Sequence, residues 1–348
     1  MTYISGLGTA TPRFELSQEQ VGRSICDYLE LGSNERRVAE RVFRRTCVET
    51  RRTVLEEFSG FYRPGEAPSL SSRMTVFERE APDLAASAAR EALEQAGLCA
   101  DEIDHLIVVT CTGVYTPGLD VDLVRLLKMR ESVGRTLISM MGCSGAFSGL
   151  RVAKSIAESG PKRRVLLVAA EISTIHLDRS ADLADFVAYA LFGDGAAATV
   201  VESHPRESPL VKLGLDRSGV YPDAGHVMRW NVDEDGFHVS LSSDLPEQVG
   251  GRLPVFIAPL LEDRPEFWVV HPGGPAVLRE VGGVLGLRKE SIASSWAVLR
   301  TFGNLSSATV LFVLAKELAQ GVRKSHAQGL MLGFGPGLTL EALQISWP

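Results

Sequence analysis

The sequence predicts an α/β fold built from two similar halves, and two observations carry that prediction. Short apolar runs alternate with segments whose apolar residues recur at helical spacing, a pattern typical of buried strands connected by helices. When the chain is compared with itself at an offset of 161 residues, the apolar run that ends at His271 aligns with the apolar run that ends at Thr110. At the same offset Cys143 aligns with Asn304. We therefore expect an N-terminal half over residues 1–204 and a C-terminal half over 205–348.

The alternation is clearest in the first half. A helical pattern over 81–97 ends at Gly97, a residue type that suits a helix C-terminus. The apolar runs that follow predict buried strands, and a helix is expected over 144–159, directly after the second of them. The predicted strands are His105–Thr110, Thr136–Met140, Val165–Ala169 and Ala196–Val201.

Three further segments complete the prediction. Residues 205–245 carry turn signals such as Ser218-Gly219 and Asp235-Gly236, and they predict a β-hairpin region with a strand over Gly236–Leu241. Residues 57–75 are rich in Gly, Pro and Ser, and they predict a surface excursion. In the internal comparison, an apolar stretch over 308–319 aligns with the helix predicted over 144–159.

Composition excludes several classes of function. The 348 residues, 45% of them hydrophobic, suffice for a large core or two fused ones. The net charge of −7 does not favour a nucleic-acid or anionic-membrane partner. The five cysteines are scattered, without a CxxC pair, which predicts a reduced cytoplasmic protein without disulfides or a metal site. No apolar stretch is long enough to span a bilayer, and no signal peptide is visible at the start of the sequence.

Cys143 stands at a predicted strand-to-helix turn, within Gly142-Cys143-Ser144-Gly145. A cysteine there meets unpaired backbone N–H groups and the positive end of the helix dipole, and both stabilise a thiolate and lower the pKa of the thiol. The commoner role of an isolated cysteine is that of a small buried core residue. Cys143 is therefore a candidate nucleophile with a structural alternative.

His271 and Asn304 are two further candidates with structural alternatives. His271 follows an apolar strand, where polar groups usually face a ligand crevice, although a core histidine is equally common. Facing a crevice, it could hold a neighbouring thiol as thiolate and donate a hydrogen bond to a substrate carbonyl. Asn304 precedes a helical run and could be an ordinary helix N-cap. The internal repeat, which sets Asn304 opposite Cys143, favours instead an amide N–H that binds a developing enolate oxygen.

Five motifs follow one another along the chain. They are Gly142-Cys143-Ser144-Gly145, Ala190-Leu191-Phe192-Gly193-Asp194-Gly195-Ala196-Ala197, His271-Pro272-Gly273-Gly274, Gly303-Asn304-Leu305-Ser306-Ser307-Ala308 and Gly333-Phe334-Gly335-Pro336-Gly337-Leu338-Thr339. Their order and approximate spacing resemble those of chalcone synthase and its bacterial relatives, the type III polyketide synthases. The resemblance implies a thiolase fold, with two pseudo-symmetric α/β halves in α-β-α-β-α layers. The N-terminal hundred residues match this family more loosely.

The resemblance also implies roles for individual residues. Cys143 would be the nucleophile, with His271 and Asn304 as its partners, and Phe192 and Phe237 resemble two aromatic gatekeepers between a CoA tunnel and the cavity. By position, Thr116 resembles a residue that reaches across a dimer into the partner's cavity. Further candidates for substrate contact are Cys111, His176, Met228, Trp230, Gly273, Ser306, Gly335 and Pro336.

Ordinary core packing explains Cys111 and Met228 equally well. The residues at positions 176 and 228 also bear on the product. Plant members usually carry Thr and Gly where this chain has His176 and Met228, so a plant-like chalcone product is not expected. The stretch from Met228 to Ser242 resembles the microbial branch that makes alkylresorcinols and alkylpyrones, which favours an aliphatic acyl starter.

The implied reaction is an iterative decarboxylative condensation of malonyl-CoA onto an acyl-CoA starter, followed by cyclisation to a pyrone or a resorcinol. No cofactor or metal is expected beyond these CoA thioesters. Arg44, Arg45 and Arg51 are candidate contacts for the CoA phosphates, although arginine runs are mostly solvated surface. A homodimer is implied, and an acyl carrier protein is a possible starter donor.

Two rival interpretations remain open. A β-ketoacyl-ACP synthase III shares the fold and a Cys-His-Asn triad, but usually carries His-Gln-Ala-Asn where this chain has His271-Pro272-Gly273-Gly274. It also tends to have Gly in place of Pro336. A non-catalytic thiolase-fold subunit would be expected to lose the nucleophile, which is retained here as Cys143.

Overall fold

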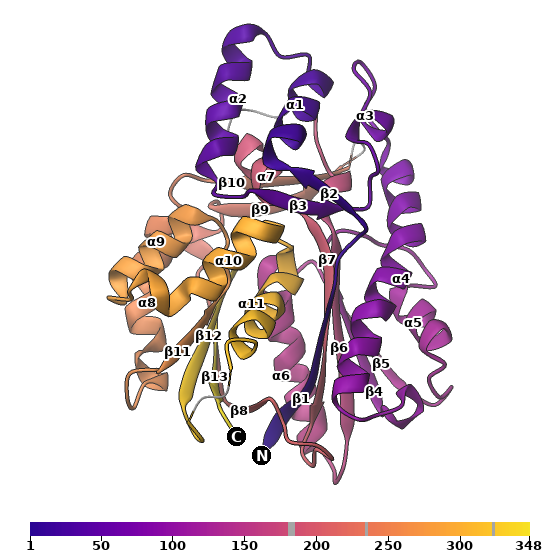
Figure 1. The fold of residues 1–348 in the computed structure, drawn as a ribbon, viewed down its shortest axis with the longest axis vertical. Helices are drawn as coiled ribbons and strands as arrows, with labels where there is room; N and C mark the ends of the chain where they lie inside the picture. Colours follow the sequence, from indigo (N-terminus) through magenta and orange to yellow (C-terminus); the bar gives the residue numbers. More distant parts are fainter. Residues whose placement is uncertain (180–184, 234–235, 322–323) are drawn as a thin grey trace.

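One nine-stranded sheet runs through the computed structural model, which describes residues 1–179, 185–233, 236–321 and 324–348 (Figure 1). The strand order is β11-β12-β13-β8-β1-β7-β6-β4-β5. The neighbours β5, β4 and β6 are parallel, as are β11 and β12, and the other pairs are antiparallel. The strands are β1 (Thr2–Ala10), β4 (His105–Thr110), β5 (Gly134–Ser139), β6 (Arg164–Ile172), β7 (Asp194–Glu202), β8 (Val211–Val220), β11 (Phe267–Val270), β12 (Gln328–Gly335) and β13 (Thr339–Ser346).

The internal repeat seen in the sequence is present in the strand order. In the first half β4, β6, β7 and β1 are neighbours in that order, with one parallel pair followed by two antiparallel pairs. In the second half β11, β12, β13 and β8 repeat the same arrangement. The two sets join where β1 pairs with β8 in the middle of the sheet. The proposed boundary at 204/205 falls between β7 and β8 and stays a prediction.

Alternating side chains of the strands divide the core into layers. In β4, Leu106 faces the core under α4 and α5, whereas Ile107 faces α6 and α11. In β11, Val269 faces the same two helices, whereas Trp268 packs toward α8, α9 and α10. Helices α6 and α11 are therefore enclosed between the two halves of the sheet, giving five α-β-α-β-α layers. The helices are α4 (Leu70–Gln95), α5 (Leu119–Leu127), α6 (Gly145–Glu158), α8 (Leu245–Ile257), α9 (Pro275–Val284), α10 (Ala293–Phe302) and α11 (Thr309–Leu318).

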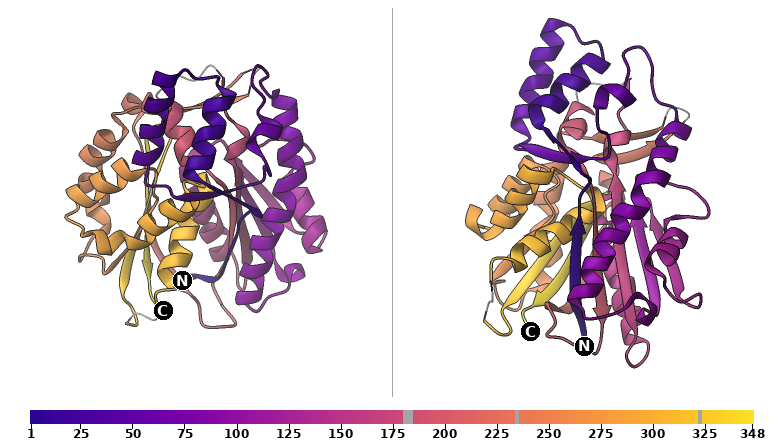
Figure 2. Two further views of the ribbon diagram at one scale, coloured as in Figure 1. Left: turned by 45° about the horizontal axis from the view of Figure 1, so that its top comes forward. Right: turned by 45° about the vertical axis from the view of Figure 1, so that its right-hand side comes forward.

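A smaller group of elements lies beyond one end of the sheet. Figure 2 shows from two sides that the indigo helices α1 and α2 lie beyond this end. Two short antiparallel sheets, β2–β3 and β9–β10, lie between these helices and the large sheet (Figure 1). The elements are β2 (Phe14–Ser17), α1 (Gln18–Tyr28), α2 (Ser33–Arg45), β3 (Thr50–Thr53), α3 (Phe58–Phe61), α7 (Asp185–Leu191), β9 (Met228–Val232) and β10 (Phe237–Leu241).

Most predicted elements are confirmed, some with shifted ends. The strand over 105–110 is reproduced in full, and the hairpin expected within 205–245 is β9–β10, although Asp235 of its predicted turn lies outside the described residues. The surface excursion over 57–75 is confirmed in part, because most of these residues are exposed, but the segment is not irregular throughout. That segment contains α3 and the start of α4, which begins eleven residues before the predicted 81 because the Ser69 hydroxyl accepts the Ser72 N–H as a helix cap.

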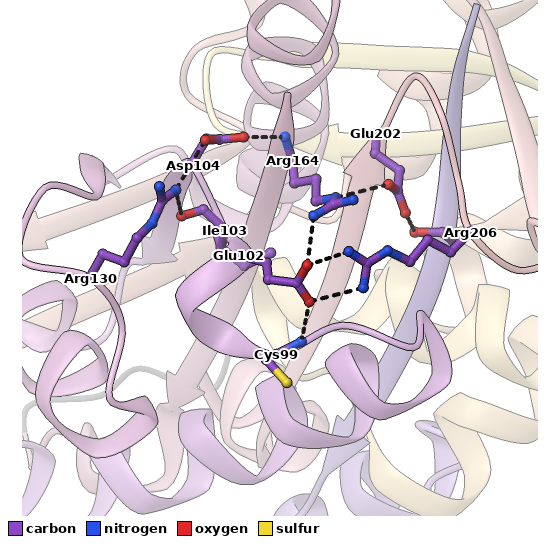
Figure 3. Close-up of polar contacts among 9 residues, drawn as sticks. Cys99, Glu102, Ile103, Asp104, Arg130, Arg164, Glu202 and Arg206 are labelled. Atoms are coloured by element: carbon purple, nitrogen blue, oxygen red, sulfur yellow. Dashed lines mark hydrogen bonds and ion pairs between the residues drawn. The ribbon is translucent and has the colours of Figure 1, made fainter. Parts of the chain in front are cut away.

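A cluster of charges joins segments at the end of the sheet opposite His271 (Figure 3). Glu102 binds Arg206 and lies 3.1 Å from Arg164 at the start of β6. Asp104 accepts the backbone N–H of Arg164 at 3.0 Å and pairs with Arg130 at 3.0 Å. These bonds hold the starts of β4 and β6 together, which fixes where their carboxyl ends meet. Within the described ranges, no helix is both long and apolar enough to cross a membrane.

Candidate active site

The three candidate catalytic residues lie at the ends of different elements and line one cavity. Cys143 is in the short η2 turn (Gly142–Ser144) that leads into α6, His271 follows β11, and Asn304 follows α10. All three side chains are at least 94% buried. The cavity that they line has a volume of about 40 Å³. The sequence positions 143 and 304, equivalent in the internal repeat, are therefore neighbours in space.

The amide of Asn304 is oriented by its own surroundings. Its Oδ1 accepts the backbone N–H of Ser306 at 2.9 Å and the Thr309 hydroxyl at 3.1 Å. Its Nδ2 lies 3.8 Å from Cys143 Sγ. Because two donors hold the oxygen, the N–H group is the part of this amide that is free for the sulfur or for a ligand. The predicted N–H donor is thus present, and the side chain also stabilises the turn that begins α11.

Ser306 brings a second polar group to the sulfur. Its Oγ lies 4.0 Å from Cys143 Sγ, and its backbone has φ +50°. A non-glycine residue in this region is strained, and such residues gather at functional sites. The strain is held in place by the Asn304 Oδ1 bond to the Ser306 N–H.

Burial determines the charge state of the Cys143 thiol. It raises the pKa of this thiol to about 12, while the hydrogen bonds from Asn304 and Ser306 act in the opposite direction. The sequence had suggested a lowered pKa from the start of a helix. In the structure the exclusion of water outweighs that effect, because a thiolate loses more solvation on burial than a neutral thiol.

His271 is buried with both ring nitrogens available. Neither Nδ1 nor Nε2 has a hydrogen-bond partner among the described residues. Burial lowers the pKa of this imidazole to about 3, so the ring is neutral at physiological pH. A neutral imidazole has one donor and one acceptor nitrogen. The alternative of a core histidine satisfied by the backbone is therefore wrong.

Most residues predicted to contact substrate line the Cys143 cavity, and the rest of its wall is largely apolar. The wall includes Leu241, Leu245, Val277 and Phe334. The predicted residues that line it, besides the three catalytic candidates, are Cys111, Phe192, Met228, Trp230, Gly273, Ser306 and Pro336.

Four predicted residues have other surroundings. Phe237 is buried and stacks on His176, with ring centroids 4.8 Å apart, and neither lines the Cys143 cavity. Gly335 ends β12 so close to Ser144 that an added Cβ would lie 2.2 Å from its hydroxyl oxygen, so this position has no room for a side chain. Thr116 is exposed, and its predicted role in a partner's cavity stays a prediction.

Arg51 is not a phosphate contact, and this prediction is wrong. Its side chain is 1% exposed, and its guanidinium donates to the carbonyl oxygens of Tyr189 (2.6 Å), Phe192 (2.7 Å) and Ala190 (2.8 Å), and to Gln18 Oε1. A cation at these carbonyls caps the C-terminus of α7. Arg51 thereby positions the backbone that carries Phe192.

The other two arginines differ in their surroundings. Arg45 lines a second cavity, of about 380 Å³, which shares Leu241, Leu245 and Gly273 with the Cys143 cavity. Arg44 lies in a separate cavity between α1 and α2, 4.0 Å from Glu40. Of these two arginines, only Arg45 lines a cavity that adjoins the Cys143 site.

Sequence reasoning missed a buried carboxylate next to the site. Glu171 is fully buried in β6 and accepts the Cys111 N–H at 3.0 Å and the hydroxyls of Thr112 (2.7 Å) and Ser307 (2.5 Å). Burial raises the pKa of this carboxyl, and the three donors limit the rise. The available signal was a single acidic residue within the apolar run over 165–172.

Comparisons with known proteins identify the family. Residues 2–205 match the N-terminal domain of the chalcone and stilbene synthases, and residues 213–346 match the C-terminal domain. A relative named type III polyketide synthase 21, from rice (Oryza sativa subsp. japonica), is 35% identical over 98% of this chain and 92% of its own length.

Solved structures agree with this assignment. The C-terminal type III polyketide synthase domain of Steely1, a type I/III hybrid from Dictyostelium, superposes with a TM-score of 0.93 at 25% identity, covering 99% of both chains. CsyB in complex with CoA-SH superposes with a TM-score of 0.90 at 26% identity, covering the whole of both chains. The five layers are those of the thiolase fold, and the chain belongs to the chalcone and stilbene synthase family, the condensing enzymes known as type III polyketide synthases.

Proposed function

We propose that this enzyme extends an acyl starter on Cys143 with malonyl-CoA units and then cyclises the product to a pyrone or a resorcinol. The observation that carries the proposal is the convergence of Cys143 Sγ, the free N–H of Asn304 and the unpaired nitrogens of His271 in one buried cavity. CoA thioesters supply both the acyl groups and the leaving groups, so the proposed cycle requires no metal or redox cofactor.

Loading begins with a neutral thiol beside a neutral imidazole. Cys143 transfers its proton to His271 as its sulfur bonds to the starter carbonyl, and the tetrahedral intermediate expels CoA thiolate. The imidazolium then protonates the departing CoA. Because burial opposes charge on both groups, a thiolate–imidazolium pair is more stable here than either ion alone.

Extension begins with the decarboxylation of malonyl-CoA. The carbon–carbon bond breaks, CO₂ leaves, and the electron pair forms an enolate whose oxygen accepts hydrogen bonds from Asn304 Nδ2–H and from His271. An apolar wall favours the loss of a carboxylate as neutral CO₂, since burying an ion is unfavourable. The enolate carbon then attacks the Cys143 thioester and releases the thiolate, and the chain, two carbons longer on CoA, returns to Cys143 for the next round.

The neighbouring 380 Å³ cavity is the proposed route for the CoA arm. It shares Leu241, Leu245, Gly273 and Val277 with the Cys143 cavity, and its wall carries Arg45 and Arg279, which offer positive charge to phosphates. Phe192 is proposed as a gatekeeper of the Cys143 cavity, and Phe237 as a buried support behind it.

An aliphatic starter is favoured by the apolar lining of the Cys143 cavity. The cavity of about 40 Å³ is far smaller than the several hundred Å³ of typical ligand pockets. We therefore expect short acyl groups to react without rearrangement, and longer ones to require displacement of Met228, which forms part of the wall.

A homodimer is proposed through the free edge of the large sheet. β5 is the last strand in the sheet order, and Leu137 on it is 48% exposed. Met140 and Met141, which follow β5 directly, and Val114, which follows the neighbouring strand β4, are also exposed large apolar side chains. An apolar edge strand is usually covered by another chain. We expect sedimentation to give a dimer, and Leu137→Lys to shift it toward monomer.

The remaining proposals concern delivery and compartment. The starter arrives on CoA or on an acyl carrier protein, both of which present a thioester on the same phosphopantetheine arm. The five cysteines are free, which suits a reducing cytoplasm.

The experiment that tests the function is mass spectrometry of products from purified enzyme, malonyl-CoA and acyl-CoAs from acetyl to stearoyl. We expect pyrones or resorcinols that disappear with Cys143→Ala. A single condensation that occurs only with malonyl-carrier protein would favour fatty-acid initiation instead. Absence of both product and acyl-Cys143 would favour a non-catalytic subunit.

A further inference from the structure

A second, smaller cavity lies beside the Cys143 cavity, and we name it the inner chamber. Its volume is about 20 Å³, and its wall includes Arg51, Ser173, His176 and Trp230. Ser173, Trp230, Phe192 and Val239 also line the Cys143 cavity, so these four residues form part of the wall of both spaces.

The inner chamber gathers polar atoms that are buried without partners. Within the described parts of the chain, Arg51 Nε, Ser173 Oγ, His176 Nδ1 and Trp230 Nε1 are buried and make no hydrogen bond. The side chains of Arg51, Ser173 and His176 are at least 91% buried. Buried polar groups are nearly always hydrogen-bonded, so four unpaired atoms on residues that line one small cavity indicate a ligand atom that pairs with some of them.

The donors and acceptors of the inner chamber are fixed by the surrounding bonds. His176 Nε2 lies 2.7 Å from the carbonyl oxygen of Thr112, which only accepts, so Nε2 carries the proton and Nδ1 is an acceptor. Arg51 Nε–H and Trp230 Nε1–H are donors only, and the Ser173 hydroxyl serves either role. A carbonyl oxygen can accept from two of these donors, and a hydroxyl can in addition donate to His176 Nδ1.

The aromatic ring of His176 is held in place by its neighbours. It stacks on Phe237 with ring centroids 4.8 Å apart and an interplanar angle of 15°, and its centroid lies 6.0 Å from that of Trp230. A polar site on a rigid support discriminates better than a mobile one, because the unpaired groups cannot turn away to find other partners.

We propose that the inner chamber binds an oxygen atom carried by the far part of the acyl chain on Cys143. Among aliphatic starters of equal length, the enzyme then selects those that carry an oxygen atom on the chain, such as oxoacyl groups. This inference rests on the proposed function and refines it, since it specifies the chemistry of the starter. The volume suits one oxygen atom of a ligand or of a water molecule. A starter that brings only methylene groups would displace that water and leave the donors unpaired.

The test compares matched starters as CoA thioesters with malonyl-CoA. The pairs are pentanoyl and 4-oxopentanoyl, heptanoyl and 6-oxoheptanoyl, and nonanoyl and 8-oxononanoyl. We expect kcat/KM for product formation to be at least about tenfold higher for the oxo starter in one pair or more, because sites with buried donors reject analogues that lack the acceptor. The pair with the largest ratio reports the distance from Cys143 to the inner chamber.

Variants identify the groups responsible. Trp230→Phe keeps an aromatic ring and removes the donor, and Ser173→Ala removes only a hydroxyl, so both should reduce the ratio toward one. Ser295→Ala is the matched control, because the Ser295 hydroxyl is also buried and unpaired but lies on α10 and lines neither cavity. It should leave the ratio unchanged.

The outcomes separate this inference from the proposed function. Equal rates within every pair would overturn the proposal that the inner chamber binds an oxygen atom of the starter, and would leave the chamber to water alone. The proposed condensation reaction would still stand. A preference that survives in both Trp230→Phe and Ser173→Ala would also overturn it. Absence of product from every starter would instead refute the proposed function.

Discussion

Replacement of Arg51 tests whether one buried cation holds the backbone beside the active site. Arg51→Met keeps the length of the side chain but removes the donors to Tyr189 O, Phe192 O and Gln18 Oε1, while Ala190 O keeps its bond from Gln18 Nε2 at 2.8 Å. Each buried acceptor left unpaired costs about 1–3 kcal/mol, and the apolar replacement recovers part of this by avoiding the burial of a charge. We expect a net loss of about 3–5 kcal/mol.

The loss can be measured as a change in melting temperature. An unfolding entropy of about 2.1 cal/mol/K per residue gives roughly 0.7 kcal/mol/K for a chain of 348 residues. The expected loss then corresponds to a decrease of about 4–7 °C. Arg52→Met is the control, because Arg52 is partly exposed and its pairing with Glu15 at 2.8 Å contributes at most about 1 kcal/mol.

The same variant should impair catalysis. Asn304 donates its backbone N–H to Leu191 O at 2.8 Å and accepts the Gly193 N–H at 3.0 Å, so the backbone held by Arg51 also holds Asn304. Arg51→Met should therefore reduce kcat for malonyl-CoA decarboxylation, measured as CO₂ release below the melting temperature. A melting temperature within about 1 °C of the parent, or a larger decrease in Arg52→Met, would refute the reasoning.

Three further predictions concern the site and its surroundings. Asn304→Ala removes a hydrogen bond that lowers the pKa of the Cys143 thiol, so iodoacetamide should alkylate Cys143 more slowly at a given pH, as read from the peptide by mass spectrometry; an unchanged rate would contradict the assignment of Nδ2 to the sulfur. Burial raises the pKa of Asp194 to about 6 from 3.8, so the folded state binds this proton more tightly than the unfolded state. Proton binding by Asp194 therefore contributes about 3 kcal/mol to the free energy of unfolding below pH ~4, and this contribution is lost as the pH rises through ~6. Asp194→Asn should therefore gain stability relative to the parent between pH 4.5 and 7 in thermal melts, and parallel pH profiles would count against this burial effect. Met228→Ala enlarges the Cys143 cavity and should shift the preferred acyl-CoA toward longer chains in the product assay, whereas an unchanged starter profile would show that Met228 does not limit the chain.

The sequence predicted those parts of the fold that depend on local pattern. The apolar run over 105–110 became β4 because a strand buried on both faces requires a continuous apolar segment. The convergence of Cys143 and Asn304 was also predictable, since the internal repeat compares equivalent positions of two similar halves. The apolar run and the internal repeat are both properties of the amino-acid sequence, and neither depends on contacts that form only when the chain folds.

The features that were missed depend on contacts between distant segments. Arg51 resembles a surface arginine in sequence, and only the carbonyls of 189–192, far along the chain, make it a structural residue. Arg73 is similar: it lies in the segment predicted as a surface excursion, yet it is 3% exposed and donates to Leu177 O at 2.8 Å. The reversal of the expected pKa of Cys143 has the same origin, because burial is a property of the folded chain.

The position of β1 has a consequence for how the chain is synthesised. Thr2–Ala10 pairs with β7, where Tyr3 lies opposite Glu202, and with β8, where Thr2 lies opposite Leu213. After its own synthesis β1 therefore has no strand partner until about two hundred more residues have followed, roughly 10–40 s at ordinary elongation rates. During that time β4, β5 and β6 can already pair, whereas the apolar N-terminal segment must be kept from aggregating.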